Sequence, residues 1–207
     1  MFPEGVPLSK RIFDLALTSA GLVILSPVLL LLAVWVRLAH GSPVLFTQVR
    51  PGHFGRPFKI YKFRSMRVDA QARGPQITVG EDARITRSGA LIRKYKIDEF
   101  PQFINVLFGD MSLVGPRPEV PRYVGLYPPD VRDVILSVRP GITDLASIAY
   151  RDESDLLGRS TDPERTYVEE VLPAKLALCE RYVRERSFFG DLAIIGRSMR
   201  VSFSRQS

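Results

Sequence analysis

The longest apolar run of the chain covers residues 15–36, LALTSAGLVILSPVLLLLAVWV, and contains no charged side chain. At about 1.5 Å of rise per residue, a helix of this length extends roughly 33 Å, enough to cross the apolar core of a bilayer. Ser26 and Pro27 stand near its centre, and a proline inside a helix removes one backbone donor and kinks or breaks the helix. The pattern predicts a membrane helix interrupted at Ser26-Pro27.

The charges on both sides of this run are positive. Lys10 and Arg11 precede it, and no acidic residue occurs between Arg37 and Arg67, a stretch that holds several lysines and arginines. A spanning helix normally carries its basic flank on the cytoplasmic side alone. The residues leave two topologies open: a re-entrant hairpin that turns back at Ser26-Pro27 with both ends in the cytoplasm, or a kinked helix that spans the membrane.

Shorter patterns follow the apolar run. Residues 43–52 and 57–66 are rich in β-branched and aromatic side chains, and the turn-rich RPGHFGR between them indicates a β-hairpin. Residues 70–82 predict a mobile loop, and a helix is expected from near Ser88 through residue 96. A second helix is expected at Asp98, with Asp98 as its N-cap, since a helical apolar face follows.

The C-terminal half alternates proline-rich and helical patterns. Residues 115–130 predict an extended, stiff loop with one short helix, and residues 139–143 predict a turn. Helices are expected over residues 163–172 and 173–188. Residues 188–205 predict an amphipathic basic helix, which suits a membrane surface or a terminal helix packed on the core. The whole pattern predicts an α+β fold that is mostly helical.

Composition narrows the class of protein. The 207 residues suit one domain, or one domain with an appendage, and the formal net charge of +7 implies an anionic partner. No zinc finger, basic zipper or aromatic RNA-binding motif points to nucleic acid. Cys179 is the only cysteine, and His40 and His53 are the only histidines, which excludes an internal disulfide and argues against zinc and histidine-based catalysis.

Two adjacent carboxylates, Asp98 and Glu99, interrupt this basic chain in the segment KYKIDEFPQF. On one reading Asp98 caps the next helix and Glu99 is solvated, because a helix N-terminus stabilises negative charge. On the other, the repulsion between them is relieved by a divalent cation, and oxygen ligands of this kind suit Mg²⁺ with substrate phosphates. An aspartate can also act as a nucleophile toward phosphorus.

Basic side chains in the same half of the chain suit a phosphate-bearing substrate. Arg117 stands between Pro116 and Pro118, whose fixed backbone would present its planar guanidinium to a phosphate or a nucleobase edge. Taken singly, the remaining basic residues fit solvated surface positions, but together they could neutralise a pyrophosphate: Lys59, Lys62, Arg64, Arg93 and Arg139.

The ordered motifs KRIFDLALTSAGLVILSPVLL, LFTQVRPG, FKIYKFRSM, LIRKYKIDEFPQFINVLFGDMSLVGPRPE and RPGIT resemble the bacterial sugar transferases, the monotopic phosphoglycosyl transferases. The resemblance covers nearly the whole chain. It implies transfer of a sugar 1-phosphate from a UDP-sugar to polyprenyl phosphate, with release of UMP, as the step that initiates assembly of a surface glycan. It also implies Mg²⁺ as cofactor and an enzyme at the cytoplasmic face of the bacterial inner membrane, against anionic lipid of the inner leaflet.

The resemblance assigns roles to residues by position. Asp98 would attack the phosphate that carries the sugar and form a phosphosugar-aspartyl intermediate, and Glu99 would hold the metal. Arg117 would meet the uridine end, and Arg93 and Arg139 match family arginines near the phosphates. The family's re-entrant helix, broken at Ser-Pro, would make residues 1–40 a monotopic membrane segment and residues 41–207 one cytoplasmic catalytic unit.

One segment departs from the family's usual pattern. Family members often read RPGITGWAQV, whereas Asp144 and Leu145 stand here in place of Gly-Trp, which puts the identity of the substrate in doubt. A second function class also fits the charge: a membrane-anchored basic scaffold that binds anionic lipid or nucleic acid. A homodimer is compatible with the sequence, although no heptad pattern argues for it.

Overall fold

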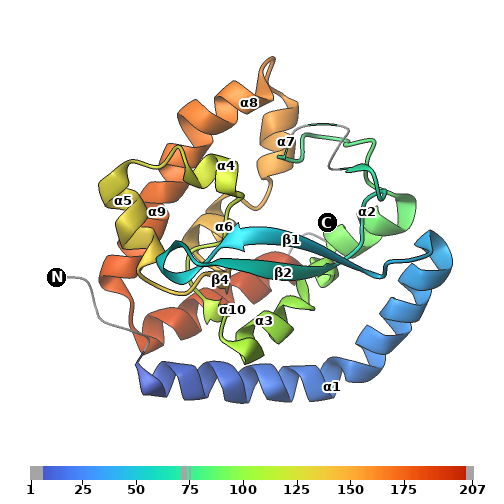
Figure 1. The fold of residues 1–207 in the computed structure, drawn as a ribbon, viewed down its shortest axis with the longest axis horizontal. Helices are drawn as coiled ribbons and strands as arrows, with labels where there is room; N and C mark the ends of the chain where they lie inside the picture. Colours follow the sequence, from blue (N-terminus) through green and yellow to red (C-terminus); the bar gives the residue numbers. More distant parts are fainter. Residues whose placement is uncertain (1–6, 71–73, 75, 204–207) are drawn as a thin grey trace.

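The computed structural model describes residues 7–70, 74 and 76–203. Figure 1 shows a mostly helical fold around a central hairpin, which agrees with the predicted α+β class. The α-helices are α1 (Leu8–His40), α2 (Arg87–Lys94), α3 (Gln102–Phe108), α4 (Pro121–Val124), α5 (Pro129–Leu136), α6 (Leu145–Ala149), α7 (Glu153–Gly158), α8 (Pro163–Thr166), α9 (Leu172–Glu185) and α10 (Phe188–Phe203). The strands are β1 (Leu45–Pro51), β2 (Pro57–Phe63), β3 (Ser112–Val114) and β4 (Gly141–Thr143), and shorter helical turns are η1 (His53–Gly55), η3 (Ile97–Glu99) and η4 (Tyr167–Val171).

The apolar run lies in α1, which alone among the described residues is long and apolar enough to cross a membrane. In the turn before Pro27, the hydroxyl of Ser26 donates to the carbonyl of Val23 at 2.8 Å. The helix continues through Pro27, and Figure 1 shows it following one edge of the molecule before it turns toward β1. Proline commonly bends a helix in this way. The predicted interruption is therefore a bend in one helix, and the route of this segment through a membrane stays a prediction.

Much of the surface in the middle of α1 does not pack on the rest of the protein. Val23, Ile24 and Leu31 are 74%, 74% and 72% exposed. Contiguous exposed apolar surface of this kind marks a site of contact with a membrane or with another protein. The centre of α1 is thus built for surroundings other than water.

Both ends of α1, in contrast, are fixed to the same folded body. Near the start, Arg11 donates to the carbonyls of Val106 and Leu107 at 2.6 and 3.0 Å, in the last turn of α3. Near the end, Arg64 donates to the carbonyls of residues 40–42, among them that of Ser42 at 2.9 Å. The helix therefore leaves the body and returns to it.

The hairpin predicted over residues 43–52 and 57–66 is confirmed. β1 and β2 pair antiparallel, from Leu45 opposite Phe63 to Pro51 opposite Pro57. Gly55 in the connection has a positive φ of 73°, a conformation that glycine adopts at no steric cost. Phe58 and Ile60 of β2 are buried in one cluster with Val106 of α3, so the hairpin packs against α3.

The turn predicted at residues 139–143 is wrong. Gly141–Thr143 is the strand β4, which pairs in parallel with β3, so that Ser112 lies opposite Gly141 and Val114 opposite Thr143. The two backbones approach so closely that a Cβ on Gly141 would lie 2.1 Å from the backbone nitrogen of Gly115. Strands of three residues are too short to show an alternating pattern, which is why the sequence hides them.

Two clusters of buried side chains form most of the core. One gathers α4, α5, α7, η4 and α9 around Tyr123 and Tyr167. The other joins β3 to α9 and α10, and Phe13 of α1 packs against it. The helix predicted over residues 188–205 is present through residue 203, and its last two predicted residues lie outside the described part of the chain. It has features of both readings, since Ile194 is buried while Phe189 is 80% exposed.

The remaining expectations are met in part. α2 agrees with the helix expected near Ser88, α4 is the short helix expected among the prolines, and α8, η4 and α9 cover residues 163–185. Helices α5, α6 and α7 were not predicted. Of the loop expected over residues 70–82, residues 71–73 and 75 lie outside the described part, and residues 76–82 hold no helix or strand.

Candidate active site

The two carboxylates lie in η3, a single 3₁₀ turn between α2 and α3. Asp98 is not the N-cap of the following helix, as the sequence had suggested: α3 begins at Gln102, after Pro101, and no side chain caps it. Lys96 precedes the turn with a left-handed backbone at φ 54°, which is uncommon for a residue other than glycine. This local turn directs Asp98 inward, where it is 5% exposed.

Glu99 is held by two basic side chains. Nη1 of Arg117 donates to its Oε2 at 3.0 Å, Nη2 of Arg117 donates to its Oε1, and Nζ of Lys62 donates to the same Oε1 at 3.0 Å. Burial opposes ionisation of Glu99, but Arg117 and Lys62 outweigh it and hold the pKa of Glu99 well below its usual range. Glu99 is therefore a fixed negative charge.

Asp98 has the opposite environment. Its carboxylate takes part in no hydrogen bond or ion pair with another described residue. Burial, and next the negative charge of Glu99, raise the pKa of Asp98 to about 6, although Lys62, Arg93 and Arg117 act against them. Two neighbouring carboxylates thus differ in environment: Glu99 is held by basic side chains, and Asp98 is buried without a hydrogen-bond partner among the described residues.

Arg117 reaches Glu99 from a loop whose backbone is fixed at several points. The carbonyl of Pro116 accepts from the N–H of Gly141 at 3.0 Å, and the carbonyl of Pro118 accepts from Nη1 of Arg50 at 2.9 Å. The N–H of Arg117 itself donates to Oδ2 of Asp144 at 3.1 Å. The stiffness predicted from the two prolines is thus completed by contacts to β1, β4 and the start of α6.

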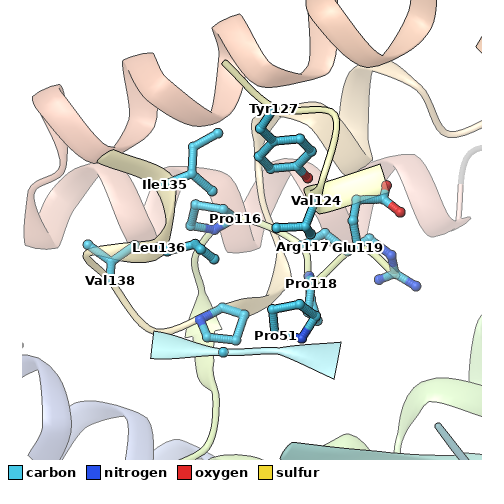
Figure 2. A pocket seen from close by; sticks show the side chains of 12 residues that line it. Pro51, Pro116, Arg117, Pro118, Glu119, Val124, Tyr127, Ile135, Leu136 and Val138 are labelled. Carbon is cyan, nitrogen blue, oxygen red and sulfur yellow. The ribbon is translucent and has the colours of Figure 1, made fainter. Parts of the chain in front are cut away.

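Figure 2 shows a pocket against this loop. Pro116 and Pro118 border it together with Pro51 of β1, Arg117 and Glu119 lie on one side, and the apolar side chains of Ile135, Leu136 and Val138 lie on the other. Pro116 and Pro118 therefore line a pocket, and their contact with a substrate stays a prediction.

Glu119 anchors the far end of the loop. It accepts hydrogen bonds from Tyr167 at 2.7 Å and from Lys175 at 2.8 Å. Despite burial, Lys175 and Tyr167 lower the pKa of Glu119 to about 2. Because Lys175 also donates to Glu153 at 2.9 Å, the loop is tied to α7 and α9.

The structure brings together some of the predicted basic residues and separates others. Lys62 and Arg93 act on Asp98, and Arg93 donates to Thr78 at 3.0 Å. Lys59 points to solvent from β2.

Arg64 and Arg139 are placed elsewhere. Arg64 is buried, and its guanidinium donates to the carbonyls at the end of α1; its expected contact with phosphate stays a prediction. The guanidinium of Arg139 lies near Gly109 at the end of α3. Burial is the main cause of the lowered pKa of Arg11, and the positive charge of Arg139 is the second. The expected place of Arg139 near the substrate phosphates stays a prediction.

Three site residues were missed from the sequence. Lys96 acts on both carboxylates, Arg50 lies close enough to Arg117 and Glu99 for their charges to affect its pKa, and Asp144 holds the Arg117 backbone. Burial is the main cause of the lowered pKa of Lys96, with Arg117 second. Lys96 could have been found from its place two residues before Asp98, and Asp144 from its departure from the family pattern, whereas no local signal marked Arg50.

The oxygens of the two carboxylates suit a cation that takes most of its ligands from the substrate and from water. Among the described residues, no group of three or more His, Cys, Asp or Glu side chains could hold a metal. A carboxylate offers about four lone-pair directions, and three on Glu99 are taken by Arg117 and Lys62, which leaves one on Oε2. One or two carboxylates plus phosphate and water oxygens is a usual ligand set for Mg²⁺.

The chain is similar to proteins of known families. The model of the family described as bacterial sugar transferase matches residues 6–205. An uncharacterized sugar transferase EpsL of Bacillus subtilis is 40% identical over 191 residues, which cover 92% of this chain and 85% of that protein.

Two longer relatives have named activities. A UDP-glucose:undecaprenyl-phosphate glucose-1-phosphate transferase of Klebsiella pneumoniae is 36% identical over 201 residues, or 96% of this chain. A UDP-N-acetylgalactosamine-undecaprenyl-phosphate N-acetylgalactosaminephosphotransferase of Aeromonas hydrophila is 36% identical over 194 residues, or 93% of this chain. The chain spans only 41% and 43% of the lengths of these two proteins.

Proposed function

The chain belongs to the bacterial sugar transferase family, and from this premise we propose that it transfers a sugar 1-phosphate from a UDP-sugar to polyprenyl phosphate. The observation that carries the proposal is the contrast between its two adjacent carboxylates. Glu99 is ionised and held by Arg117 and Lys62, whereas Asp98 is buried, unpaired among the described residues and shifted to a pKa of about 6. The names of the longer relatives support the substrate classes.

The reaction would proceed in two displacements at one phosphorus atom. An oxygen of Asp98 attacks the phosphorus that bears the sugar, the bond from that phosphorus to the bridging oxygen breaks, and UMP leaves. A phosphate oxygen of polyprenyl phosphate then attacks the same phosphorus and displaces Asp98, which gives polyprenyl diphosphate-sugar. The pKa of Asp98 lets it be ionised as nucleophile at neutral pH, and also makes it a better leaving group than an alkoxide.

The other residues hold charge during these steps. Lys62, Lys96 and Arg93 surround the carboxylates and offset the charge of the diphosphate. Arg117 fixes Glu99; the contact of Arg117 with the uridine end of the donor remains a prediction. Glu99, through its open Oε2 direction, and Asp98 are the residues that would hold Mg²⁺, and the ion when bound would neutralise phosphate charge and polarise the bond that breaks.

The polyprenyl substrate requires a place at a membrane, and the geometry of α1 supports one. Its apolar centre is exposed, while its two ends are fixed to one body by Arg11 and Arg64. A segment with both ends on the same body would enter one leaflet and return, with residues 41–207 at the cytoplasmic face of the inner membrane. This monotopic arrangement is the topology we propose, in place of a spanning helix.

The test is a screen for UMP release across UDP-sugars with polyprenyl phosphate and Mg²⁺. We expect release with at least one donor, loss of release with Asp98→Asn and with a chelator, and a sugar-phosphate mass on Asp98 in trapped enzyme. Near-normal release by the Asp98→Asn variant would exclude Asp98 as nucleophile. No release with any donor, together with salt-sensitive binding to anionic vesicles, would favour the basic scaffold.

A further inference from the structure

Asp144 is completely buried, and its carboxylate accepts four hydrogen bonds. Oδ1 accepts from the N–H of Ser147 at 2.6 Å and from the hydroxyl of Ser147 at 2.5 Å, which caps α6. Oδ2 accepts from the N–H of Arg117 at 3.1 Å and from the thiol of Cys179 at 3.3 Å. Four donors match the four acceptor directions of a carboxylate. The cap of α6 therefore uses only half of this side chain.

Oδ2 of Asp144 accepts a hydrogen bond from the backbone of the loop Pro116-Arg117-Pro118. Proline has no N–H, so Arg117 supplies the only backbone donor of Pro116-Arg117-Pro118. That single N–H donates its hydrogen bond to Asp144. Without it, the backbone of these three residues would keep only the hydrogen bonds that its carbonyls accept from Gly141 and Arg50.

We propose that Asp144 is a positioning residue for Arg117, and that through Arg117 it sets the position of Glu99 beside Asp98. The contacts form a continuous chain: Asp144 fixes the backbone of Arg117, and both terminal nitrogens of the Arg117 side chain hold Glu99. This role rests on the proposed transfer reaction only in its effect on rate, because the contacts themselves belong to the fold.

Cys179 extends the chain of contacts to α9. Burial, and next the charge of Asp144, raise the pKa of the Cys179 thiol well above its usual range. The thiol therefore stays protonated and donates a hydrogen bond to Asp144. A glycine, which the family pattern often has at this position, could supply neither the cap nor the acceptor for Arg117. The departure from the pattern is thus a feature of this chain's own site.

The first experiment measures backbone amide exchange and needs no activity. The exchange of the Arg117 amide is followed by mass spectrometry on peptides that cover residues 115–119, in the full chain and in three variants. Asp144→Ala removes both halves of the carboxylate, Asp144→Asn keeps the shape with one acceptor oxygen, and Ser147→Ala removes one donor on the capping side only.

We expect the Arg117 amide to exchange at least ~10-fold faster in Asp144→Ala, to an intermediate extent in Asp144→Asn, and at the wild-type rate in Ser147→Ala. Should Asp144→Ala fail to fold, the isosteric Asp144→Asn variant decides alone. An Arg117 amide that stays equally protected in a folded Asp144 variant would overturn the proposal.

The second experiment measures UMP release as a function of donor concentration, which separates kcat from KM. We expect Asp144→Asn to lower kcat/KM at least ~10-fold, because Arg117 and the Glu99 that it holds would lose their fixed position beside Asp98. We expect Ser147→Ala to behave as wild type. Combining Asp144→Asn with Arg117→Ala should cost little beyond Arg117→Ala alone, and fully additive losses would contradict a role through Arg117.

The two experiments separate this inference from the proposed function. If the wild-type chain releases no UMP while the exchange results hold, the transfer reaction is wrong and the positioning of the loop stands. If UMP is released and the Arg117 amide ignores Asp144, the reaction stands and the positioning role is wrong.

Discussion

At the scale of single residues, adjacent positions in one turn acquire opposite chemistry from their neighbours. Glu99 points to Arg117 and Lys62, and Asp98 points to no partner among the described residues. Their ordinary pKa values, 3.8 for Asp98 and 4.5 for Glu99, are close. Despite burial, the charges of Arg117 and Lys62 lower the pKa of Glu99, whereas burial and the charge of Glu99 raise that of Asp98, so an ionised carboxylate lies beside one that titrates nearer neutral pH.

We expect the buried Asp98 carboxylate to lower the free energy of unfolding of the protein at neutral pH. Its pKa rises from an ordinary value of 3.8 to about 6. At about 1.4 kcal/mol per unit, burying this charge costs up to ~3 kcal/mol at neutral pH. We expect Asp98→Asn to raise the free energy of unfolding at pH 7 by about 1–3 kcal/mol while it abolishes UMP release. Thermal and denaturant unfolding measure the first effect.

The pH dependence gives this prediction a sign that can be checked. The folded-state pKa of Asp98 lies above the unfolded value, so between about pH 4 and 6 the folded protein holds a proton that the unfolded chain has lost. The wild type therefore loses stability from this group as the pH rises through that window, and Asp98→Asn does not. A stability gap between the two that shrinks from pH 4 to 6 would contradict the raised pKa.

The sequence predicts the residues of this site better than it predicts their partners. Asp98-Glu99 and Pro116-Arg117-Pro118 are local motifs whose chemistry is readable from adjacent letters. Arg64 and Arg139 look the same as Lys62 in sequence, and only the tertiary fold sends them to the ends of α1 and α3. The departure from the family pattern marked Asp144, but its partner, the N–H of Arg117, lies far from it in the chain, and only the fold reveals that contact.

At the scale of elements, the junction at the end of α1 depends on one buried guanidinium. Arg64 donates to the carbonyls of His40, Gly41 and Ser42, and so satisfies acceptors that a helix end leaves unpaired. His40 adds a contact between its Nε2 and the hydroxyl of Ser88, 2.7 Å apart, at the start of α2. The membrane helix and the helix that leads into the site are thus joined at this point.

We expect Arg64→Met to lower the free energy of unfolding by about 2–4 kcal/mol, because several buried carbonyls lose a charged donor. Arg56→Met is the matched control, since Arg56 is an exposed arginine of the same hairpin, and it should change stability by less than ~0.5 kcal/mol. Denaturant unfolding in detergent measures both. Equal stability of the two variants would show that the carbonyls are satisfied without Arg64.

Element length decides how much of the fold could be predicted. The hairpin and the helices α1, α9 and α10 are long enough to show a period, and each was expected. β3 and β4 have three residues each, and α6 has five, which is too few for a pattern. These short elements are also the ones that hold the Arg117 loop, so the least predictable parts of the chain position its most recognisable motif.

At the scale of the whole molecule, the apolar centre of α1 and the two anchored ends make one argument about topology. The body that Arg11 and Arg64 contact is a single packed unit, in which Phe13 of α1 joins the same core cluster as Tyr182. A folded unit of this kind cannot lie on both sides of a bilayer. If the contacts at both ends of α1 persist in the membrane, the helix enters and leaves by the same face.

Cysteine labelling in sealed vesicles checks this topology. Cys179 is buried with a raised thiol pKa, so the native chain should react slowly and serves as the background. Leu8→Cys and Phe54→Cys place an exposed thiol at the first residue of α1 and beyond its end, at positions that are 75% and 68% exposed. We expect an impermeant maleimide to label both from the cytoplasmic side only, because the ends of α1 share one body. Val23→Cys should be protected until detergent removes the lipid. Labelling of Leu8→Cys from the outer side alone would mean that α1 spans the membrane, and the contacts of Arg11 with α3 could then not exist in the native protein.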